Sequence, residues 1–266
     1  FREVREMLHR EVDYEAERHF TESFASKLAD DARYVVPRVL GDYSSDRVLT
    51  TTYEHGHHVK DAQVQALPQA RRNALARNFL ELFLKEFFRW GMVQSDPHFG
   101  NYRIRVGERG PDRIVLLDFG ATRTFGRGFI ESYSRIVHGA LLRNRTEIWA
   151  GARAIGLMGE HFPRPVLDAF AEMCELIVEP FADPDGGAVP PQLKTPLGEY
   201  RWGDSDLPMR AAAVAARNTL SVHFRVPPRE IIFLHRRLAG VFIMLATLRA
   251  ELSARPLLLD ALKETE

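Results

Sequence analysis

Residues 69–90 carry the most regular pattern in the chain, and the segment that follows them restricts the fold most strongly. Apolar side chains recur there at three- and four-residue steps, which predicts an amphipathic helix that ends at Gly91. The apolar stripe consists of Leu75, Phe79, Leu82, Phe83, Phe87 and Trp90. Two short predicted strands, at 92–94 and 102–106, flank the polar loop SDPHFGN. The sequence therefore predicts a long helix that leads directly into a loop held between two strands.

Downstream of this loop the chain contains one more clear strand and is then helical. A turn at 107–112 leads into the apolar strand IVLL, which ends at the DFG motif of residues 118–120. Helical periodicity resumes near Phe129 and continues past Gly151, and the rest of the chain reads as helices broken by a Pro-, Gly- and Asp-rich insert at 183–206.

The upstream part of the chain has a similar mixture. Residues 3–29 predict one charged amphipathic helix, and residues 32–54 predict two short strands around a turn at 44–46. A little β-structure followed by many helices indicates an α+β fold.

The composition excludes several classes of function. The 36 basic residues balance the 36 acidic ones, so no overall positive charge favours nucleic acid as a partner. The single cysteine, Cys174, cannot form an intramolecular disulfide. The longest nearly apolar run, residues 238–248, is too short to cross a bilayer.

Two motifs carry the candidate chemistry. Asp96 and Asn101 lie five positions apart in the loop, and Asp118 opens the DFG motif after the hairpin. Kinases have the spacing D-x-x-x-x-N followed by a metal-binding D-F-G. Phosphoryl transfer requires hard oxygen ligands for Mg²⁺ and a carboxylate near the acceptor. Either motif alone is compatible with a turn, but their order and separation favour a nucleotide-phosphate site.

The first predicted helix contains three further acidic residues, Glu11, Asp13 and Glu17. In kinases a helix in this position presents one glutamate to the lysine that holds the nucleotide phosphates. A solvated acidic helix face explains the same residues, and the residues alone favour this simpler interpretation.

Four segments, in order along the chain, resemble the UbiB-type atypical kinase family of coenzyme Q biosynthesis. They are EVDYEAE, VLTTTYEHG, VQSDPHFGN and VLLDFGATR. The segment FRVPPREIIFLHRRLAGVFIMLATLRA also resembles the C-terminal helix pair of this family, and the mitochondrial members from eukaryotes are more similar than the average bacterial ones. The resemblance implies a protein-kinase-like fold, with residues 1–55 as a partial N-lobe and residues 56–266 as a mainly helical C-lobe.

The resemblance also implies a role for each residue of the two motifs. Asp96 corresponds to the catalytic aspartate, and Asn101 and Asp118 correspond to the magnesium ligands, so these three form the implied catalytic set. Phe99 stands where the family commonly has proline, a change that removes no ligand. ATP and Mg²⁺ are the implied cofactors.

The remaining implied residues bind the nucleotide. Glu11 and Asp13 correspond to the E-x-D motif of the family, and Glu17 to the glutamate that pairs with the phosphate-binding lysine. The segment 51–54 corresponds to the hinge that holds adenine, although a threonine stands where the family usually has glutamate. The implied hinge residues are Thr52, Tyr53 and Glu54.

Parts of the family pattern are missing from the sequence. No V-A-I-K strand, glycine- or alanine-rich nucleotide loop or K-x-G-Q motif precedes Glu11. We therefore expect the chain to lack part of the N-lobe, and this fragment by itself to bind ATP poorly. There is also no A-P-E motif and no room for a long activation segment between Gly120 and the helix near Phe129. This favours ATP hydrolysis, or transfer to a small or lipid-like acceptor, over phosphorylation of proteins.

The function implied by the resemblance is that of an atypical kinase or ATPase that supports ubiquinone biosynthesis. Its implied partners are isoprenoid or quinone lipid intermediates and other proteins of that pathway. The implied location is the cytoplasm or the matrix side of the mitochondrial membrane, with peripheral membrane contact. Two alternatives remain: a small-molecule phosphotransferase of the aminoglycoside or choline kinase type, and a non-catalytic pseudokinase scaffold.

The C-terminal segment contains a pair of adjacent arginines. Arg236 and Arg237 follow His235 and precede an apolar helix face. Their spacing favours a position at the edge of the core, with the charges in solvent, over contact with membrane phosphates. His235 is expected to be buried or half-buried.

Overall fold

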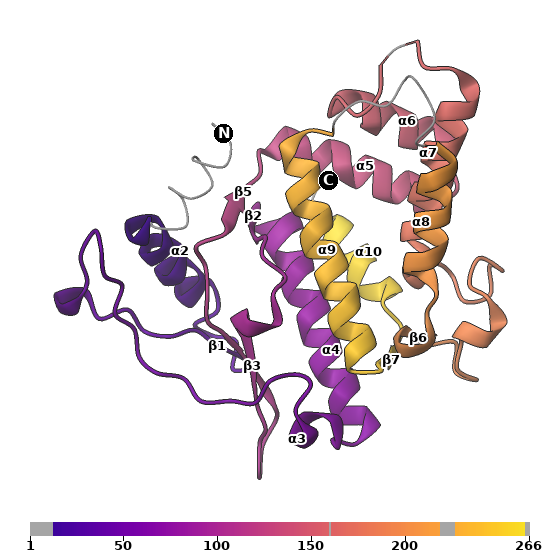
Figure 1. The fold of residues 1–266 in the computed structure, drawn as a ribbon. Coiled ribbons are helices and arrows are strands. Elements are labelled where there is room, and N and C mark those ends of the chain that lie inside the picture. The colour runs from indigo at the N-terminus through magenta and orange to yellow at the C-terminus, as the bar shows by residue number, and fades with distance from the viewer. Residues whose placement is uncertain (1–12, 160, 219–226, 264–266) are drawn as a thin grey trace.

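The computed structural model describes residues 13–159, 161–218 and 227–263 of the protein (Figure 1). Its helices are α2 (Tyr14–Lys27), α3 (Ala62–Gln65), α4 (Gln69–Leu84), α5 (Arg127–Leu141), α6 (Arg145–Ala154), α7 (Arg164–Ile177), α8 (Leu207–Asn218), α9 (Arg229–Thr247) and α10 (Arg255–Lys263). Its strands are β1 (Tyr34–Val35), β2 (Met92–Gln94), β3 (Tyr102–Arg105), β4 (Arg113–Leu116), β5 (Thr122–Thr124), β6 (Tyr200–Arg201) and β7 (Glu251–Leu252). None of the described helices is long and apolar enough to cross a bilayer.

Helix α4 forms the centre of the core. A π-helical turn, Lys85–Arg89, continues it, and Gly91 ends the helical segment with a positive φ of 58° that suits glycine. This confirms the predicted helix at 69–90, whose apolar stripe is buried from Leu75 to Phe87. Helix α4 packs against both α9 and α10, and Figure 1 shows α9 lying along it.

Two small antiparallel pairings follow α4. Strand β3 pairs with β4, and β2 pairs with β5, while β1 joins β4 in parallel. The predicted strands at 92–94 and 102–106 and the apolar strand before the DFG motif are confirmed, as is the turn that joins β3 to β4. In that turn the Asp112 carboxylate accepts hydrogen bonds from the Gly107 amide and from Arg71 on α4.

The predicted pair of regular strands at 32–54 is wrong in part. Only β1 is a strand there, and the remaining pairing consists of isolated bridges, Val39 with Thr51 and Ser45 with Val48. The reason is local: a 3₁₀ turn at Gly41–Tyr43 interrupts the ladder. The Ser44 hydroxyl accepts a hydrogen bond from the Thr50 amide in place of a strand neighbour.

Helical structure continues past Gly151, as predicted, but it is divided into two helices. The chain breaks after α5 and starts again as α6, with Arg143 at a positive φ of 54°. The Asn144 side chain accepts a hydrogen bond from the Glu147 amide and caps α6. The break allows α6 to fold back onto α5, where a Cβ at Gly151 would overlap the Ser132 carbonyl oxygen and Ile136.

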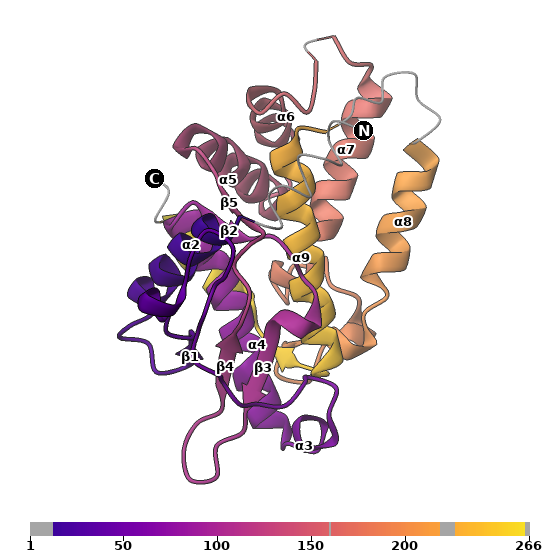
Figure 2. The same cartoon turned by 60° about the vertical axis from the view of Figure 1, so that its left-hand side comes forward.

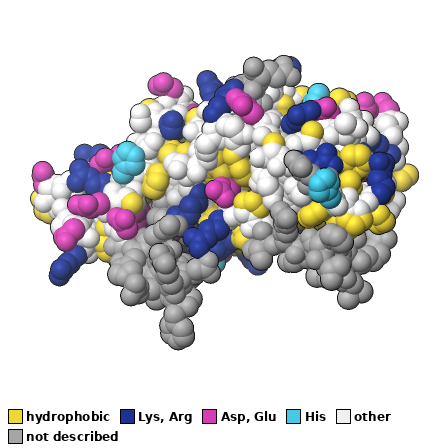
Figure 3. Space-filling model, turned by 90° about the horizontal axis from the view of Figure 1, so that it is seen from above, with side chains coloured by type: hydrophobic (Ala, Val, Ile, Leu, Met, Phe, Trp, Pro, Cys, Tyr) yellow, Lys and Arg dark blue, Asp and Glu magenta, His cyan; other side chains and the backbone are white. Residues whose placement is uncertain are grey.

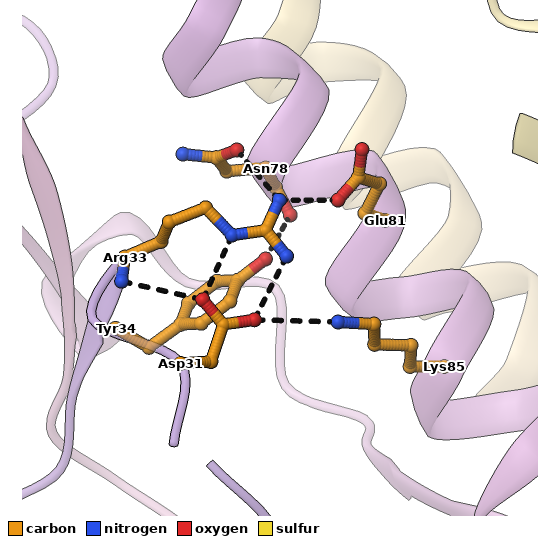
Figure 4. Close-up of polar contacts among 6 residues, drawn as sticks. All are labelled: Asp31, Arg33, Tyr34, Asn78, Glu81 and Lys85. Carbon is orange, nitrogen blue, oxygen red and sulfur yellow. Dashed lines mark hydrogen bonds and ion pairs between the residues drawn. The ribbon is translucent and has the colours of Figure 1, made fainter. Parts of the chain in front are cut away.

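Helix α2 and strand β1 lie on one side of the molecule, and α7 and α8 lie on the other (Figure 2). The segment at β1 is joined to α4 by a polar cluster in which Arg33 is central (Figure 4). Its guanidinium donates to both oxygens of Asp31 at 2.8 Å, to Asn78 at 3.2 Å and to Glu81. These hydrogen bonds from Arg33 hold the pKa of Asp31 well below its usual range. The cluster ties the predicted partial N-lobe to the helical part, and the predicted boundary at residue 55 stays a prediction.

The surface seen from above mixes charges of both signs (Figure 3). Lys and Arg side chains lie among Asp and Glu side chains, with apolar side chains between them. On this face, therefore, charges of both signs are interspersed.

Arg237 and Glu86 form an ion pair inside the core, and only 2% and 1% of their side chains are exposed. The Arg237 Nε and Nη2 atoms lie 3.2 and 3.1 Å from the two carboxylate oxygens, and Nη1 donates to the Tyr102 hydroxyl. Burial raises the pKa of Glu86 to about 7, and the guanidinium acts in the opposite direction. The expectation that Arg237 lies at the core edge is wrong, because a buried carboxylate in the π-helical turn after α4 supplies its partner. His235 is half-buried, as expected.

We predict that Arg237→Ala lowers the free energy of unfolding by about 3–5 kcal/mol at pH 8. In the variant the buried Glu86 carboxyl has no guanidinium partner, so it either keeps an unpaired charge or takes up a proton, and both outcomes oppose folding at this pH. Urea unfolding measures the loss. The control, Arg135→Ala, breaks an exposed ion pair with Glu147 and should change stability by less than about 1 kcal/mol. Equal losses in the two variants would contradict the structural role of the buried pair.

Candidate active site

The register of β3 and β4 brings Asn101 and Asp118 to the same end of one hairpin. Tyr102 pairs with Leu116, and the Leu117 amide donates to the Asn101 carbonyl oxygen at 3.0 Å. Asn101 is therefore the last residue before one strand, and Asp118 the second residue after the other. Two residues that are distant in sequence become neighbours through this pairing.

The register of β2 and β5 adds Asp96 to this end. Gln94 pairs with Thr122, and one residue further the Ser95 amide and hydroxyl both donate to the Ala121 carbonyl oxygen, at 3.2 and 2.6 Å. Asp96 therefore leaves its strand beside the segment that follows the DFG motif. The structure thus brings together all three residues of the predicted catalytic set.

Both oxygens of the Asp96 carboxylate are engaged by other side chains. The Asn101 side-chain nitrogen donates to Oδ2 at 2.9 Å, and Arg236 Nη2 on α9 lies 2.6 Å from Oδ1. The Asp96 side chain is 27% exposed, so solvent or a ligand can reach it. This geometry holds the carboxylate plane in one orientation at the mouth of the loop.

The donor set of Asn101 and Asp118 fits a magnesium ion. Because the Asn101 side chain gives its nitrogen to Asp96, its carbonyl oxygen is the atom suited to a metal. Asp118 Oδ1 accepts from the Gly120 amide at 2.9 Å, and the carboxylate retains further lone pairs. Magnesium in nucleotide sites takes one or two protein oxygens and completes its shell with phosphate and water. No group of three His, Cys, Asp or Glu side chains suited to a metal occurs in the described part of the chain.

Helix α2 packs on the DFG motif and places Glu17 beside Asp118. The Phe119 ring is buried against Phe24 of this helix, with ring centroids 4.7 Å apart. A Cβ added to Gly120 would lie 3.4 Å from Glu17 Oε2 and 3.5 Å from Asp118 Oδ1. Burial and the negative charge of Asp118 raise the pKa of Glu17, while a backbone hydrogen bond from Phe119 lowers it. Two carboxylates that face each other in this way attract a cation between them.

The other acidic residues of the first helix have different positions. Asp13 is the N-cap of α2 and accepts a hydrogen bond from the Ala16 amide at 3.0 Å. Glu11 lies outside the described residues. The predicted roles of these residues and of Glu17 in nucleotide binding stay predictions.

The predicted hinge segment lies beside residues 38–39 and contacts β3 through Glu54. Thr52 donates its backbone amide to Arg38 and its hydroxyl to Glu54, whose carboxylate also pairs with Arg105 at 2.7 Å. The Tyr53 side chain is 82% exposed. The described contacts do not link these three residues to the loop that carries Asp96, and their role in holding adenine stays a prediction.

The partner of Arg236 is a feature that the sequence did not predict. The Arg236 side chain is 56% exposed, in line with the expected position at the surface, but its guanidinium also contacts the candidate catalytic carboxylate. Arg236 and Gly240 are spaced at i and i+4 and so share one helix face. The sequence thus shows that these two residues lie on the same side of the helix. It does not show that the partner of Arg236 is a residue 140 positions away.

The fold and the site together define a kinase-like protein. The structure is similar to that of Rv3197 from Mycobacterium tuberculosis, solved as a complex with erythromycin, with a TM-score of 0.64 and 20% identity over 96% of this chain and 59% of that one. The ABC1 atypical kinase-like domain matches residues 1–151. The chain belongs to this family of atypical kinase-like proteins, which confirms the resemblance to the UbiB type and the predicted α+β, kinase-like fold.

Curated relatives agree with this membership. The chain is 33% identical to the mitochondrial atypical kinase coq-8 of Caenorhabditis elegans over 94% of its length, and 30% identical to mitochondrial COQ8B of Rattus norvegicus, also over 94%. It is 30% identical to mitochondrial COQ8 of Schizosaccharomyces pombe over 98% of its length. The chain spans only 31%, 44% and 40% of the lengths of these three relatives, respectively.

We predict that Glu17→Gln stabilises the protein more at pH 8 than at pH 4.5. Because the folded-state pKa of Glu17 is raised, ionising this residue opposes folding as the pH rises through that pKa, and glutamine removes the effect. The gain should be absent below the unfolded-state pKa. Urea unfolding of both proteins at the two pH values gives the difference. The control is Glu22→Gln, which changes an exposed glutamate of α2 that pairs with Arg18. A Glu17→Gln gain that is constant or shrinks with pH would contradict the prediction.

Proposed function

We propose that the protein is an atypical kinase or ATPase that uses Mg²⁺ and ATP. The observation that carries the proposal is the convergence of Asp96, Asn101 and Asp118 through two strand registers. Kinases use an aspartate, an asparagine and a DFG aspartate in this order for phosphoryl transfer. Similarity to relatives that are named atypical kinases supports the same activity.

Asn101 and Asp118 would hold the magnesium ion through their side-chain oxygens. When bound, Mg²⁺ neutralises charge on the phosphates during transfer. The Asn101 side-chain nitrogen donates a hydrogen bond to Asp96, and the Gly120 amide donates one to Asp118. Both ligands would therefore be oriented before the nucleotide binds. Such preorganised dipoles stabilise developing charge without the need to reorganise.

Asp96 would orient the acceptor. The acceptor oxygen forms a bond to the γ-phosphorus while the bond from phosphorus to the bridging oxygen breaks and releases ADP. The proton of the acceptor hydroxyl, or of water in the ATPase reaction, passes to a carboxylate oxygen of Asp96. The partial exposure of Asp96 leaves room for that acceptor.

The acceptor that we propose is water or a small, lipid-like molecule. Strand β5 begins at Thr122 and α5 at Arg127, so the DFG motif leads almost directly into a helix. A segment this short offers no platform for a peptide substrate. As the resemblance implies, we propose isoprenoid or quinone intermediates and proteins of ubiquinone biosynthesis as partners.

An apolar cavity of about 100 Å³ supports the choice of an apolar partner. Side chains of α5, α7 and α9 line it, together with the end of α4, and its polar groups are few. One of these is His235, which hydrogen-bonds to the Tyr133 hydroxyl at 3.0 Å and whose pKa burial lowers to about 4. A cavity of this kind excludes water and accommodates hydrocarbon groups. Peripheral membrane contact, in mitochondria or on the cytoplasmic side, is the corresponding proposal for location.

The first test concerns the metal ligand. We predict that Asp118→Asn in the whole protein abolishes Mg²⁺-dependent binding of ATP, because the amide removes the anionic ligand. Thermal-shift titration with Mg-ATP measures this, and a hundredfold loss of affinity reduces the stabilisation by up to about 2.7 kcal/mol. The control is Asp260→Asn, which changes an exposed carboxylate of α10 that pairs with Lys263. Undiminished stabilisation of Asp118→Asn would rule out the proposed metal site and favour a non-catalytic scaffold.

The second test separates catalysis from binding. We predict that Asp96→Asn keeps the affinity for Mg-ATP within a few-fold and lowers turnover by about 10²–10⁴, the range typical of a general base. Steady-state ATPase kinetics of the whole protein give kcat and KM separately. If the variant loses binding and keeps its turnover number, Asp96 is a ligand or a structural residue, and the assignment of roles in the loop is wrong.

A further inference from the structure

Arg236 reaches the candidate catalytic carboxylate from a distant part of the chain. Its Nη2 atom lies 2.6 Å from Asp96 Oδ1, while Asn101 donates to Oδ2 of the same carboxylate. Bonds from a guanidinium and an amide to the two oxygens fix both the rotation and the tilt of the Asp96 side chain. The Arg236 side chain is 56% exposed, so this contact lies at the open side of the site.

Helix α9 is anchored so that Arg236 cannot move far from the loop. The next residue, Arg237, is paired with Glu86 and Tyr102 in the core. One turn further along, Gly240 faces Pro97, and a Cβ at that glycine would overlap the proline ring. The face of α9 that carries residues 236 and 240 therefore packs directly on the loop residues 96 and 97.

The loop itself supplies no cation for Asp96. Residues 95–101 contain neither lysine nor arginine, and Gln94 and Ser95 stand where protein kinases have the histidine and arginine of H-R-D. His98 accepts a hydrogen bond from the Gly100 amide through Nδ1 and so shapes the loop. The positive charge next to the carboxylate comes from α9 instead.

We propose that Arg236 is a positioning residue that holds Asp96 in the orientation required for phosphoryl transfer. This inference rests on the proposed function and adds a residue that neither motif contains. Arg236 acts through the carboxylate: it leaves the magnesium ligands Asn101 and Asp118 in place and sets the direction in which Asp96 meets the acceptor. Misplacement of a catalytic group by about 1 Å lowers the rate by roughly 10²-fold.

The test compares Arg236→Ala, Arg236→Lys and Arg135→Ala in the whole protein. Arg236→Ala should lower kcat for ATP by about 10–100-fold and leave KM within about threefold, because only the orientation of Asp96 is lost. Arg236→Lys should recover part of kcat, since it keeps the charge without the planar fork. Arg135→Ala removes an ion pair of similar exposure on α5 and should leave both constants unchanged. The melting temperature should shift by less than about 3 °C in all three variants.

A double-mutant cycle separates positioning from a general structural effect. In a protein that already carries Asp96→Asn, Arg236→Ala should change kcat by less than about twofold, because its target has been altered. Full additivity of the two effects would overturn the proposal, as would an equal loss in Arg236→Lys and Arg236→Ala accompanied by a large fall in melting temperature.

The outcomes also separate this inference from the proposed function. If Asp96→Asn lowers turnover and Arg236→Ala does not, the positioning role is wrong and the proposed function stands. If Asp118→Asn and Asp96→Asn leave both Mg-ATP binding and turnover unchanged, the proposed function fails and the inference fails with it. A loss of kcat in Arg236→Ala, with partial recovery in Arg236→Lys and no additivity with Asp96→Asn, supports both.

Discussion

The buried ion pair between Arg237 and Glu86 is the interaction on which the arrangement of the site depends. Two buried charges are stable only when they lie close together and form good hydrogen bonds with each other. The pair therefore permits few placements of α9 against the end of the central helix. The Tyr102 hydroxyl accepts from the same guanidinium, which adds β3 to the constraint. One buried arginine thus fixes a helix, the end of the central helix and a hairpin relative to one another. Its neighbour Arg236 then has a defined direction toward the loop.

The strand pairings align the residues of the site more than they stabilise the fold. Strands β2 and β5 have three residues each, and β3 and β4 have four, so the pairings bury little surface of their own. A slip of one residue would turn each side chain to the opposite face and separate Asn101 from Asp118. Packing of α2 on Phe119 and of α4 beneath the hairpin prevents this slip. Packing in the core therefore fixes the strand registers, and these registers determine where the loop residues lie.

The sequence predicted the parts of this structure whose signals are local. The helix at 69–90 and the hairpin before the DFG motif follow from periodicity and turn residues. Motif spacing selected the three residues that the strand registers bring together, and their catalytic roles stay predictions. The break at Asn144 was missed because a helix cap is one residue within an otherwise continuous pattern. The contact of Arg236 with Asp96 could not be predicted, because it depends on tertiary packing between segments far apart in the chain.

The charges of the site explain why its polar contacts are arranged as they are. Glu17, Asp96 and Asp118 bring three carboxylates to one end of the two strand pairings, and the repulsion between Glu17 and Asp118 contributes, after burial, to the raised pKa of Glu17. Uncompensated, such a cluster opposes folding, as functional sites commonly do. Arg236 pairs with Asp96, while Glu17 and Asp118 lie close together beside Gly120. Under the proposed function, the protein would fix the carboxylate that meets the acceptor, and the negative charge of the other two would attract a cation that arrives with the nucleotide.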